Sequence, residues 1–326
     1  MRSWQNCYLQ PPGGFYIINF VYIMAAKAAD VRPESEDPAM IELVINPTAG
    51  TGHAESVGKQ MIDLLEKKQA EFHVSFTTRA GEGEPLARDA AAHGAETVFA
   101  VGGDGTVLEV ARGLRDTGAA LGIIPAGTGN DVIKTLGIPK DPVEALEYQL
   151  ARPARPLDAM TVNGKLSLNI AGTGFDVCVL DYAEKAKKFV RGLLPYLWGV
   201  ICTIFKYRAR TIRVNLDGDE IEKKMLVICM ANGRFLGGGI PIAPMAQPDD
   251  GLLTVVTIDD LPNWRMPFQL GKLLAGKVMK IPGAVERACR RVEIACAGMR
   301  VNVDGEILPM DSAVVEILPG ALTARW

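Results

Sequence analysis

The chain has 326 residues, of which 48% are hydrophobic and 22% are charged, and its formal net charge is −3. This length exceeds that of a typical domain, so we expect two domains, each with its own hydrophobic core. The small net charge argues against a nucleic-acid partner, because nucleic-acid-binding proteins gather positive charge. The six cysteines and three histidines lack the spacing of a zinc site or a disulfide framework, which favours a cytoplasmic protein with reduced cysteines.

The first 39 residues are set apart from the rest of the chain. The apolar run at residues 15–26 is shorter than the stretch of about 20 residues that a membrane-spanning helix requires. A charged, proline-containing stretch follows at residues 30–38, and a strong strand pattern begins directly after Met40. Residues 1–39 are therefore predicted to be a leader or a loose extension.

Residues 40–155 alternate short β-branched runs with helical patterns. This alternation is typical of a parallel sheet with crossover helices. The predicted strands are residues 41–45, 72–78, 97–101 and 121–125. The predicted helices are residues 55–68, 83–93 and 106–114, with another opening after Gly129. The pattern predicts an α/β domain that binds its ligand at the carboxyl ends of the strands.

Residues 156–326 have a different pattern. Two prolines in the segment 151–156 end the last helix, and short strands joined by turn dipeptides follow. This predicts a mainly antiparallel β-sandwich, and the sequence leaves open whether its last residues return to the first domain. Helical stretches at about 178–208 and 263–277 interrupt the strands. Basic residues flank the apolar part of the first stretch, which suits either a buried helix pair with solvated ends or contact with an anionic membrane.

The most specific motif is the sequence GGDGT at residues 102–106, which connects a hydrophobic strand to a helix. Glycines let a backbone approach a phosphate closely, and the free amides of a helix start attract anions. The spacing matches neither a Walker A loop nor a dinucleotide fingerprint. Asp104 would repel a phosphate unless Mg²⁺ lay between them, so it is a metal-linked candidate. The alternative is an aspartate that caps the next helix.

Two further glycine-containing loops follow predicted strands. They are residues 46–52 and residues 125–137, where Thr128, Asn130 and Asp131 offer a hydroxyl, an amide and a carboxylate. The carboxyl ends of parallel strands meet at one edge of a sheet. Three such loops at one edge predict a nucleotide site.

These motifs resemble those of a known family. Asn46-Pro47 and the segments 102–106 and 127–131 resemble the catalytic domain of the bacterial diacylglycerol kinase and related lipid kinase family. The segments 169–177, 232–253 and 303–306 resemble its β-domain signatures in the same order. The resemblance implies an NAD-kinase-like α/β domain with a parallel sheet, followed by a β-sandwich domain that takes the lipid. It also implies transfer of the γ-phosphate of ATP to a lipid hydroxyl with Mg²⁺ as cofactor.

The resemblance and the glycine loops together assign the ATP site. Thr78 could serve in place of its neighbour Thr77. The assigned positions are Asn46, Thr77, Gly102, Gly103, Asp104, Gly105, Thr106, Val107, Leu108, Thr128, Asn130 and Asp131.

The resemblance further implies a structural Mg²⁺ site in the second domain. Asp250 would supply a carboxylate, and Gln247 and Leu252 would supply main-chain oxygens, which are the ligands that a hard cation prefers. Without the resemblance, the sequence DDG at residues 249–251 is typical of a β-turn.

A lipid hydroxyl needs a base to become a good nucleophile. Asp304 and Glu306 are the candidates. Their spacing places them on one face of a strand, or on either side of a turn at Gly305. The resemblance points to Glu306 as the proton acceptor, with Asp304 able to share or replace that role. Family members often have proline where this chain has Ile307, which leaves the local turn geometry open.

Two other functions fit parts of the sequence. An NAD kinase would share the glycine loop and the β-domain, and a non-catalytic nucleotide-binding membrane module would share the fold. A lipid kinase must meet its substrate at the membrane surface, so we expect reversible, peripheral membrane contact of a cytoplasmic protein. The sequence leaves a homodimer open. Diacylglycerol, phosphatidylglycerol, a sphingoid base and a polyprenol all present a hydroxyl beside long apolar chains.

Overall fold

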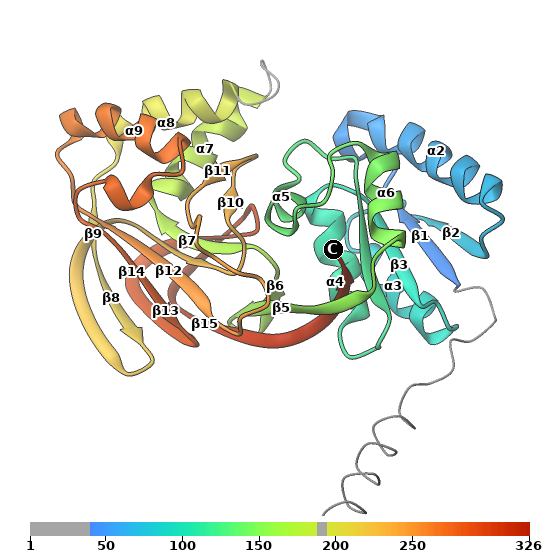
Figure 1. Ribbon diagram of the computed structural model, residues 1–326. Coiled ribbons are helices and arrows are strands. Elements are labelled where there is room, and N and C mark those ends of the chain that lie inside the picture. The colour runs from blue at the N-terminus through green and yellow to red at the C-terminus, as the bar shows by residue number, and fades with distance from the viewer. Residues whose placement is uncertain (1–39, 188–193) are drawn as a thin grey trace, which may run out of the picture. The chain divides into compact units, whose positions relative to one another are not determined.

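The computed structural model describes residues 40–187 and 194–326 (Figure 1). Contacts divide the chain into Met1–Pro38 and Ala39–Trp326, and every element below belongs to the second unit. The predicted leader and its apolar run lie outside the described residues. Within the described residues, no helix is both long and apolar enough to span a membrane.

The first part of this unit, termed the α/β lobe, is built on four parallel strands in the order β4-β3-β1-β2. Strands β1, β3 and β4 are buried along their whole length, as expected of strands covered on both faces. The elements are β1 (Ile41–Ile45), η1 (Ala49–Gly52), α2 (His53–Lys67), β2 (Phe72–Phe76), α3 (Gly83–Ala92), β3 (Thr97–Gly102), α4 (Asp104–Leu114), β4 (Ala120–Pro125), α5 (Asp131–Leu136) and α6 (Pro142–Leu150).

Alternate side chains of these strands build two cores. Leu43 and Ile45 of β1 pack with the apolar side of α2 and with Leu146 of α6. Val44 faces the other way and packs with α3 and α4. Alternate Cβ atoms point to opposite faces of a strand, so one continuous apolar run supplies both cores. Figure 1 shows the helices on both sides of the sheet.

The second part, the β lobe, is mainly antiparallel. Its elements are β5 (Ala154–Val162), β6 (Lys165–Ser167), β7 (Ile170–Gly174), α7 (Phe175–Lys187), α8 (Leu194–Lys206), β8 (Arg210–Leu216), β9 (Asp219–Ala231), β10 (Phe235–Leu236), β11 (Ile240–Pro241), β12 (Leu253–Asp259), η2 (Asn263–Arg265), α9 (Met266–Leu274), η3 (Val278–Lys280), β13 (Ala284–Cys289), β14 (Arg291–Val303) and β15 (Glu306–Arg325). The long strands β9 and β14 each pair with β7 over one part and with β8 over another.

This double pairing folds the sheet over a core of its own. Ile228 of β9 and Val292 of β14 both lie in that core. Val227 and Cys229, on the opposite face of β9, instead pack with helices α7, α8 and α9. The predicted fold class, an α/β domain followed by a mainly antiparallel β domain, is confirmed.

Strand β15 belongs to both lobes. It pairs with β14 and β5 in the β lobe, and Thr323 and Ala324 then pair with β4 of the α/β lobe in parallel. The register with β5 shifts between Leu318 and Leu322, where the amide of Gly320 donates to Asp158 Oδ1 at 2.7 Å. One continuous sheet therefore runs through both lobes. The strand that joins the lobes is β15, which is the last strand in sequence order.

The packing of α4 against α3 requires a glycine. A Cβ at Gly113 would lie 2.2 Å from the carbonyl oxygen of Glu84 and 2.9 Å from Ala87 Cβ. We expect Gly113→Ala to lower the free energy of unfolding by about 1–3 kcal/mol, because one helix must move away from the other. Gly271→Ala in α9 is the matched control, since nothing lies within 4 Å of its Cβ position. It should leave stability unchanged or raise it by up to about 1 kcal/mol. Equal effects of the two variants in urea unfolding would contradict this packing.

Candidate functional site

A cavity of about 330 Å³ lies at the carboxyl ends of the parallel strands and is called here the polar cavity. The loops that follow β1, β2, β3 and β4 all contribute to its wall. Six of the predicted ATP-site residues line it: Asn46, Thr77, Gly103, Gly105, Thr106 and Thr128. The sequence prediction that several loops converge at one edge of the sheet thus matches the geometry.

Two of these loops are packed so closely that one of them requires glycine at the contact. A Cβ at Gly127 would lie 2.3 Å from Gly103 Cα, which leaves no space for any other side chain. Asn130 holds the loop after β4 in place, because its Oδ1 accepts from the Gly127 amide and its Nδ2 donates to the Gly127 carbonyl. Asn130 itself has a positive φ of 51°, a conformation that asparagine tolerates well. Its role is to shape the loop.

The loop after β1 is attached to helix α4. Asn46 Nδ2 donates to Thr106 Oγ1 at 3.1 Å, and Asn46 Oδ1 accepts from the hydroxyl and the amide of Thr48. Thr77 and Thr78 both line the polar cavity. The Thr78 hydroxyl donates to Glu82 at 2.9 Å, so Thr77 is the better candidate for a ligand contact.

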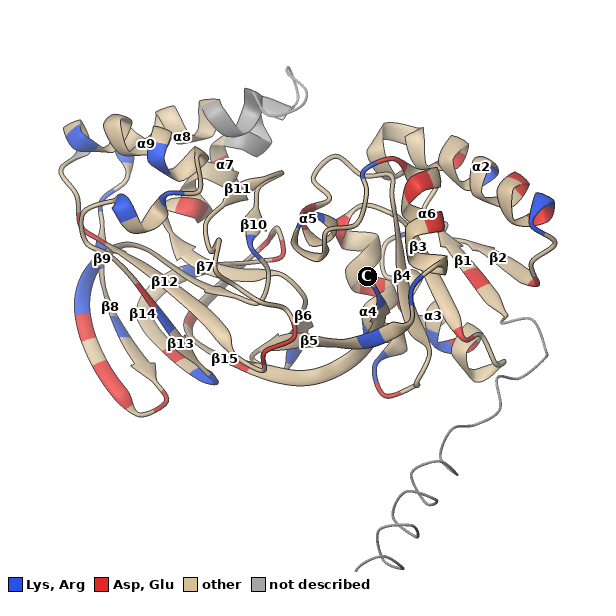
Figure 2. Ribbon diagram, viewed as in Figure 1, with Lys and Arg blue, Asp and Glu red and all other residues tan. Residues whose placement is uncertain are grey.

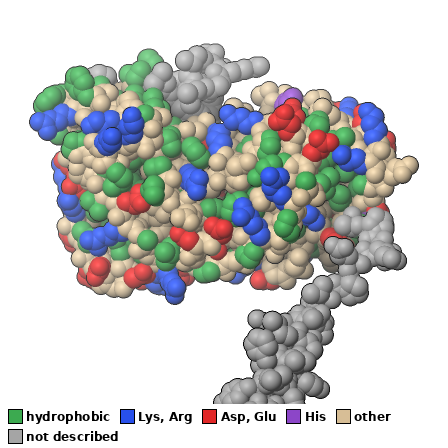
Figure 3. Space-filling view, in the orientation of Figure 1, with side chains coloured by type: hydrophobic (Ala, Val, Ile, Leu, Met, Phe, Trp, Pro, Cys, Tyr) green, Lys and Arg blue, Asp and Glu red, His purple; other side chains and the backbone are tan. Residues whose placement is uncertain are grey.

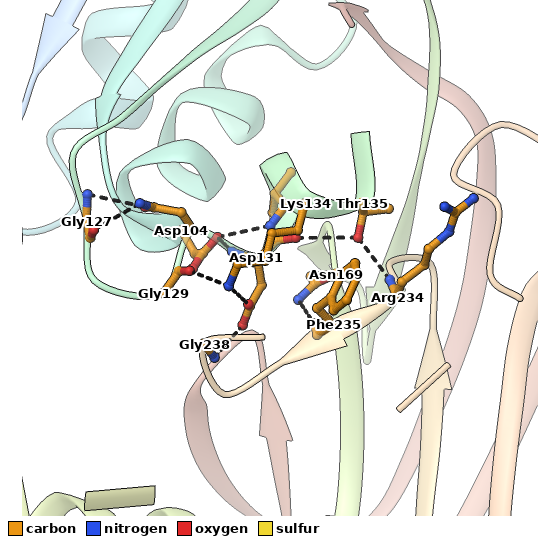
Figure 4. A network of polar contacts seen from close by, with 12 residues as sticks. Asp104, Gly127, Gly129, Asp131, Lys134, Thr135, Asn169, Arg234, Phe235 and Gly238 are labelled. Atoms are coloured by element: carbon orange, nitrogen blue, oxygen red, sulfur yellow. Dashed lines mark hydrogen bonds and ion pairs between the residues drawn. The ribbon is translucent and has the colours of Figure 1, made fainter. Parts of the chain in front are cut away.

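Asp104 caps a helix, but not the one that it begins. Its Oδ1 accepts from the amides of Asp131 at 2.8 Å and Val132 at 3.2 Å, at the start of α5 (Figure 4). Burial and the nearby Asp131 raise the pKa of Asp104 to about 6, although the two amides lower it in part. Both amides bond to Oδ1, so Oδ2 remains available for a further ligand.

Asp131 connects α5 to the β lobe. Its Oδ1 pairs with Lys134 Nζ at 2.8 Å, and its Oδ2 accepts from the amide of Gly238, in the turn between β10 and β11. A second contact runs in parallel, from the Arg234 amide to Thr135 Oγ1 at 2.9 Å. The sequence predicted Asp131 near the nucleotide, whereas the structure uses its carboxylate to join two elements.

A second cavity, of about 340 Å³, is called here the apolar cavity. Its wall comes mainly from aliphatic side chains of the β lobe, on the face of the sheet that α7, α8 and α9 cover. Asp104 and Asp304 line it as well. Gly105 lines both cavities, so the polar and apolar cavities meet at the first turn of α4.

Besides Asp104, Asn130 and Asp131, three more predicted ATP-site residues lie outside the polar cavity wall. Gly102 ends β3, and a Cβ there would lie 2.4 Å from Thr106 Oγ1. Val107 is buried in the core between α4 and the sheet, and Leu108 lines the apolar cavity. One turn of helix presents successive side chains in different directions, so a continuous segment cannot face one ligand throughout.

The two candidate bases lie at a tight turn between β14 and β15, where Asp304 is the first central residue and Glu306 directly follows the turn. Asp304 and Gly305 have positive φ angles of 49° and 97°, as in a type I′ turn. The Asp304 carboxylate accepts from three amides, those of Leu168, Asn169 and Ile170. Burial raises the pKa of Asp304, and these amides oppose the rise. The sequence left open whether residues 304–306 form an extended strand or a turn at Gly305. The structure shows the turn.

Glu306 has a different environment. It is exposed, it begins β15, and it directly follows Gly305, which lines the apolar cavity. Its carboxylate has no hydrogen-bond partner within residues 40–187 and 194–326. Asp304 is therefore committed to holding the turn against β7, while Glu306 can accept a proton.

The predicted Mg²⁺ loop is held by Asp158. The Asp158 amide donates to the Pro248 carbonyl, and Asp158 Oδ2 accepts from the Gly251 amide at 2.7 Å. Asp250 is exposed, and its Oδ1 accepts from the Leu252 amide. No group of three or more His, Cys, Asp or Glu side chains suited to a metal occurs among the described residues. One carboxylate beside main-chain oxygens of residues such as Gln247 still suits a hard cation.

Asp176 is a candidate functional residue of the apolar cavity that the sequence prediction missed. It is the second residue of α7, it lines the apolar cavity, and only 9% of it is exposed. Neither carboxylate oxygen has a hydrogen-bond partner of normal geometry. Burial raises the pKa of Asp176 to about 6, and the nearby Val177 amide and Asn302 side chain lower it only in part. The signal was present, since the acidic residue follows a glycine-containing strand end at residues 170–174.

Two family models match the chain. Residues 40–162 match the diacylglycerol kinase catalytic domain, and residues 169–325 match the YegS C-terminal NAD kinase beta sandwich-like domain.

Relatives match over most of their length. A Pseudomonas aeruginosa protein named "Probable lipid kinase YegS-like" is 36% identical over 282 residues, which cover 83% of this chain and 91% of that protein. The "Diacylglycerol kinase" of Bacillus subtilis is 29% identical over 272 residues, with 81% and 88% covered. A crystal structure of a diacylglycerol kinase from Bacillus anthracis shares the fold, with a TM-score of 0.69, 22% identity, and coverage of 90% of this chain and 98% of that one.

The burial of Asp176 predicts a pH-dependent cost in stability. Its folded pKa of about 6 lies above the ordinary value of 3.8, so the fold favours the protonated form. Stability is then lost as the pH rises from about 4 to about 6, and the loss persists at higher pH. The stability gain from Asp176→Asn should be about 2 kcal/mol larger at pH 8 than at pH 4.5 in urea unfolding.

Asp116→Asn is the matched control, because the Asp116 side chain is 84% exposed. It should give the same small change at both pH values. If Asp176→Asn behaved like this control, the Asp176 carboxylate would have a stabilising partner that offsets its burial.

Proposed function

Because the chain belongs to the lipid kinase family of the YegS-like lipid kinases and diacylglycerol kinases, we propose that it transfers the γ-phosphate of Mg·ATP to the hydroxyl of diacylglycerol or a closely related lipid. The observation that supports this proposal is the meeting of the polar and apolar cavities at Gly105. A phosphate group suits the first cavity, and an acyl chain suits the second. The hydroxyl to be phosphorylated belongs where they join.

The polar cavity has the features needed to hold the phosphates. The first amides of α4 have no partner within the helix, and its macrodipole places partial positive charge at the same end. The close contact of Gly103 with Gly127 keeps side chains away from the backbone there. Mg²⁺, bound with ATP, would supply the charge neutralisation that the carboxylate of Asp104 otherwise opposes, and Asp104 Oδ2 is the oxygen available to it.

Glu306 acts as the base in this proposal. It takes the proton of the lipid hydroxyl as that oxygen attacks the γ-phosphorus, while the bond from this phosphorus to the β,γ-bridging oxygen breaks and ADP leaves. Asp304 positions the turn that carries Glu306, through its three amide contacts to residues 168–170. The aliphatic wall of the apolar cavity excludes water, which would otherwise compete with the lipid for the phosphoryl group.

The direct test is transfer of labelled phosphate from ATP to a panel of lipids in mixed micelles with Mg²⁺. Glu306→Gln should lower kcat by about 10²–10⁴-fold with little change in the KM for ATP, because it removes the base alone. Asp304→Asn should chiefly lower the thermal unfolding temperature, because its carboxylate holds the turn. Transfer to a nicotinamide dinucleotide but to no lipid, or a fully active Glu306→Gln variant, would refute the proposal.

Asp250 with the main-chain oxygens of Gln247 and Leu252 is proposed to hold a structural Mg²⁺. Without ATP, millimolar Mg²⁺ should raise the thermal unfolding temperature of the native chain, because a ligand that binds only the folded state stabilises it. Asp250→Asn should abolish this rise. Asp249→Asn, at the neighbouring exposed carboxylate, should retain it. An equal rise in all three proteins would place the ion elsewhere.

A further inference from the structure

Large apolar side chains are exposed on the outer sides of helices α8 and α9. The segments involved are α8, the η2 turn with α9, and the η3 turn, all in the β lobe. Monomeric proteins seldom leave such side chains grouped in water unless the group has a partner. The residues, called here the exposed apolar face, are Trp198 (57% exposed), Ile201 (42%), Trp264 (66%), Phe268 (73%), Leu274 (47%) and Met279 (44%).

Helix α9 is apolar on both of its sides. Met266, Leu270 and Leu273 line the apolar cavity, whereas Phe268 and Leu274 are exposed. A helix on the surface of a water-soluble domain normally carries polar residues opposite its buried stripe. The outer side of α9 therefore lacks the composition of a surface in contact with water.

Helix α8 repeats this arrangement. Val200 and Ile204 line the apolar cavity, while Trp198 and Ile201 are exposed. The same two helices thus form part of the cavity wall and carry most of the exposed apolar face. Figure 3 shows apolar side chains gathered over α8 and α9 at the upper left, with Lys and Arg side chains beside them.

The charge of the segment that carries α9 has one sign. Between Leu261 and Ala284 the sequence has four basic residues, Arg265, Lys272, Lys277 and Lys280, and no Asp or Glu. None of these four forms an ion pair with an acidic side chain in the part of the chain that the structure describes. Figure 2 shows the basic residues on and beside α9. The whole chain is slightly acidic, so this local excess of positive charge is a feature of the face.

We propose that the exposed apolar face docks on the surface of an anionic lipid bilayer, and that the lipid substrate passes from the bilayer between α8 and α9 into the apolar cavity. Tryptophans beside basic residues are the composition that inserts at the headgroup level of an anionic membrane. A soluble protein partner would explain the exposed side chains but not the cavity directly behind them. The passage of the lipid rests on the proposed kinase function, while the docking does not.

The docking is tested by co-sedimentation of the full chain with vesicles of phosphatidylcholine alone and of phosphatidylcholine with phosphatidylglycerol. The native chain should bind the anionic vesicles more strongly, and added salt should weaken that binding. Trp264→Ala with Phe268→Ala should reduce the binding at least tenfold, and Lys277→Glu with Lys280→Glu should remove the preference for anionic vesicles. Phe76→Ala is the matched control, since Phe76 is 51% exposed but belongs to β2.

The passage of the lipid is tested with two forms of the same substrate. The Trp264→Ala, Phe268→Ala variant should phosphorylate a short-chain diacylglycerol dissolved as monomers within about twofold of the native rate, because neither side chain lines the apolar cavity. Its rate on long-chain diacylglycerol in anionic vesicles should fall at least tenfold. Loss of both rates equally, in a variant that unfolds at the native temperature, would refute a docking role in the reaction.

Two outcomes would overturn the docking itself. One is unchanged vesicle binding by the Trp264→Ala, Phe268→Ala variant. The other is a native chain that sediments as a dimer, a variant that sediments as a monomer, and equal vesicle binding by both, since a second copy would then cover the face. Vesicle binding without phosphorylation of any lipid would leave the docking in place and refute the proposed kinase function instead.

Discussion

The site depends on the two hydrogen bonds that join Asp104 to the start of helix α5. Asp104 begins α4 directly after β3, and Asp131 begins α5 after the loop that follows β4. Their contact fixes the ends of two neighbouring strands relative to each other. The carboxylate of Asp131 then continues the connection to Gly238 in the β lobe. A short run of polar contacts thus links the loop that suits a phosphate to the wall of the apolar cavity.

This arrangement concentrates negative charge in a buried place. Asp104, Asp131 and Asp304 all line the apolar cavity near its junction with the polar one, and Lys134 is the cation that pairs with Asp131. Burial and the neighbouring carboxylates raise the pKa of Asp104 to about 6, which means that its charged form is disfavoured without a cation. Natural proteins retain destabilising arrangements, such as these buried like charges, where the arrangement serves binding. A divalent cation bound with ATP would relieve it, and the same charge would hinder a phosphate that arrived without one.

The sequence predicted the parts of the fold that local patterns encode. Strand 41–45 and the strand at 97–102 are buried throughout, so their unbroken apolar runs were clear signals. Helix α4 begins at Asp104, two residues before the predicted start at Thr106, because the backbone becomes helical directly after Gly103. The convergence of the glycine loops was also predictable, since it follows from strand order in a parallel sheet.

Long-range pairing could not be read from the same patterns. Strand β15 has 20 residues and changes partners along its length, and its pairing with β4 depends on residues about 200 positions apart in the chain. The exact partner of the Asp104 carboxylate was equally hidden, since the sequence predicted a metal-linked role and offered capping only as an alternative, at the helix that Asp104 itself begins. Asp176 escaped notice because burial decides its chemistry, and the resemblance of residues 169–177 to a family signature does not show that this carboxylate is covered. In all three examples, the missing information is which distant part of the chain lies against the strand or side chain.

The carboxylates of Asp304 and Glu306 lie in different environments, and this suits them to different roles. The oxygens of Asp304 accept hydrogen bonds from three amides. Its carboxylate therefore holds in place a turn of two residues with positive φ. Glu306 lies two residues further, beyond the turn, and its exposed carboxylate is not engaged by any described residue. A group that must gain and lose a proton in each cycle cannot also be the group that fixes the backbone, because protonation would weaken the contacts that hold it. If Glu306 is the base, as we propose, the separation of these two tasks over Asp304 and Glu306 would allow the turn to keep its geometry while the base changes its charge.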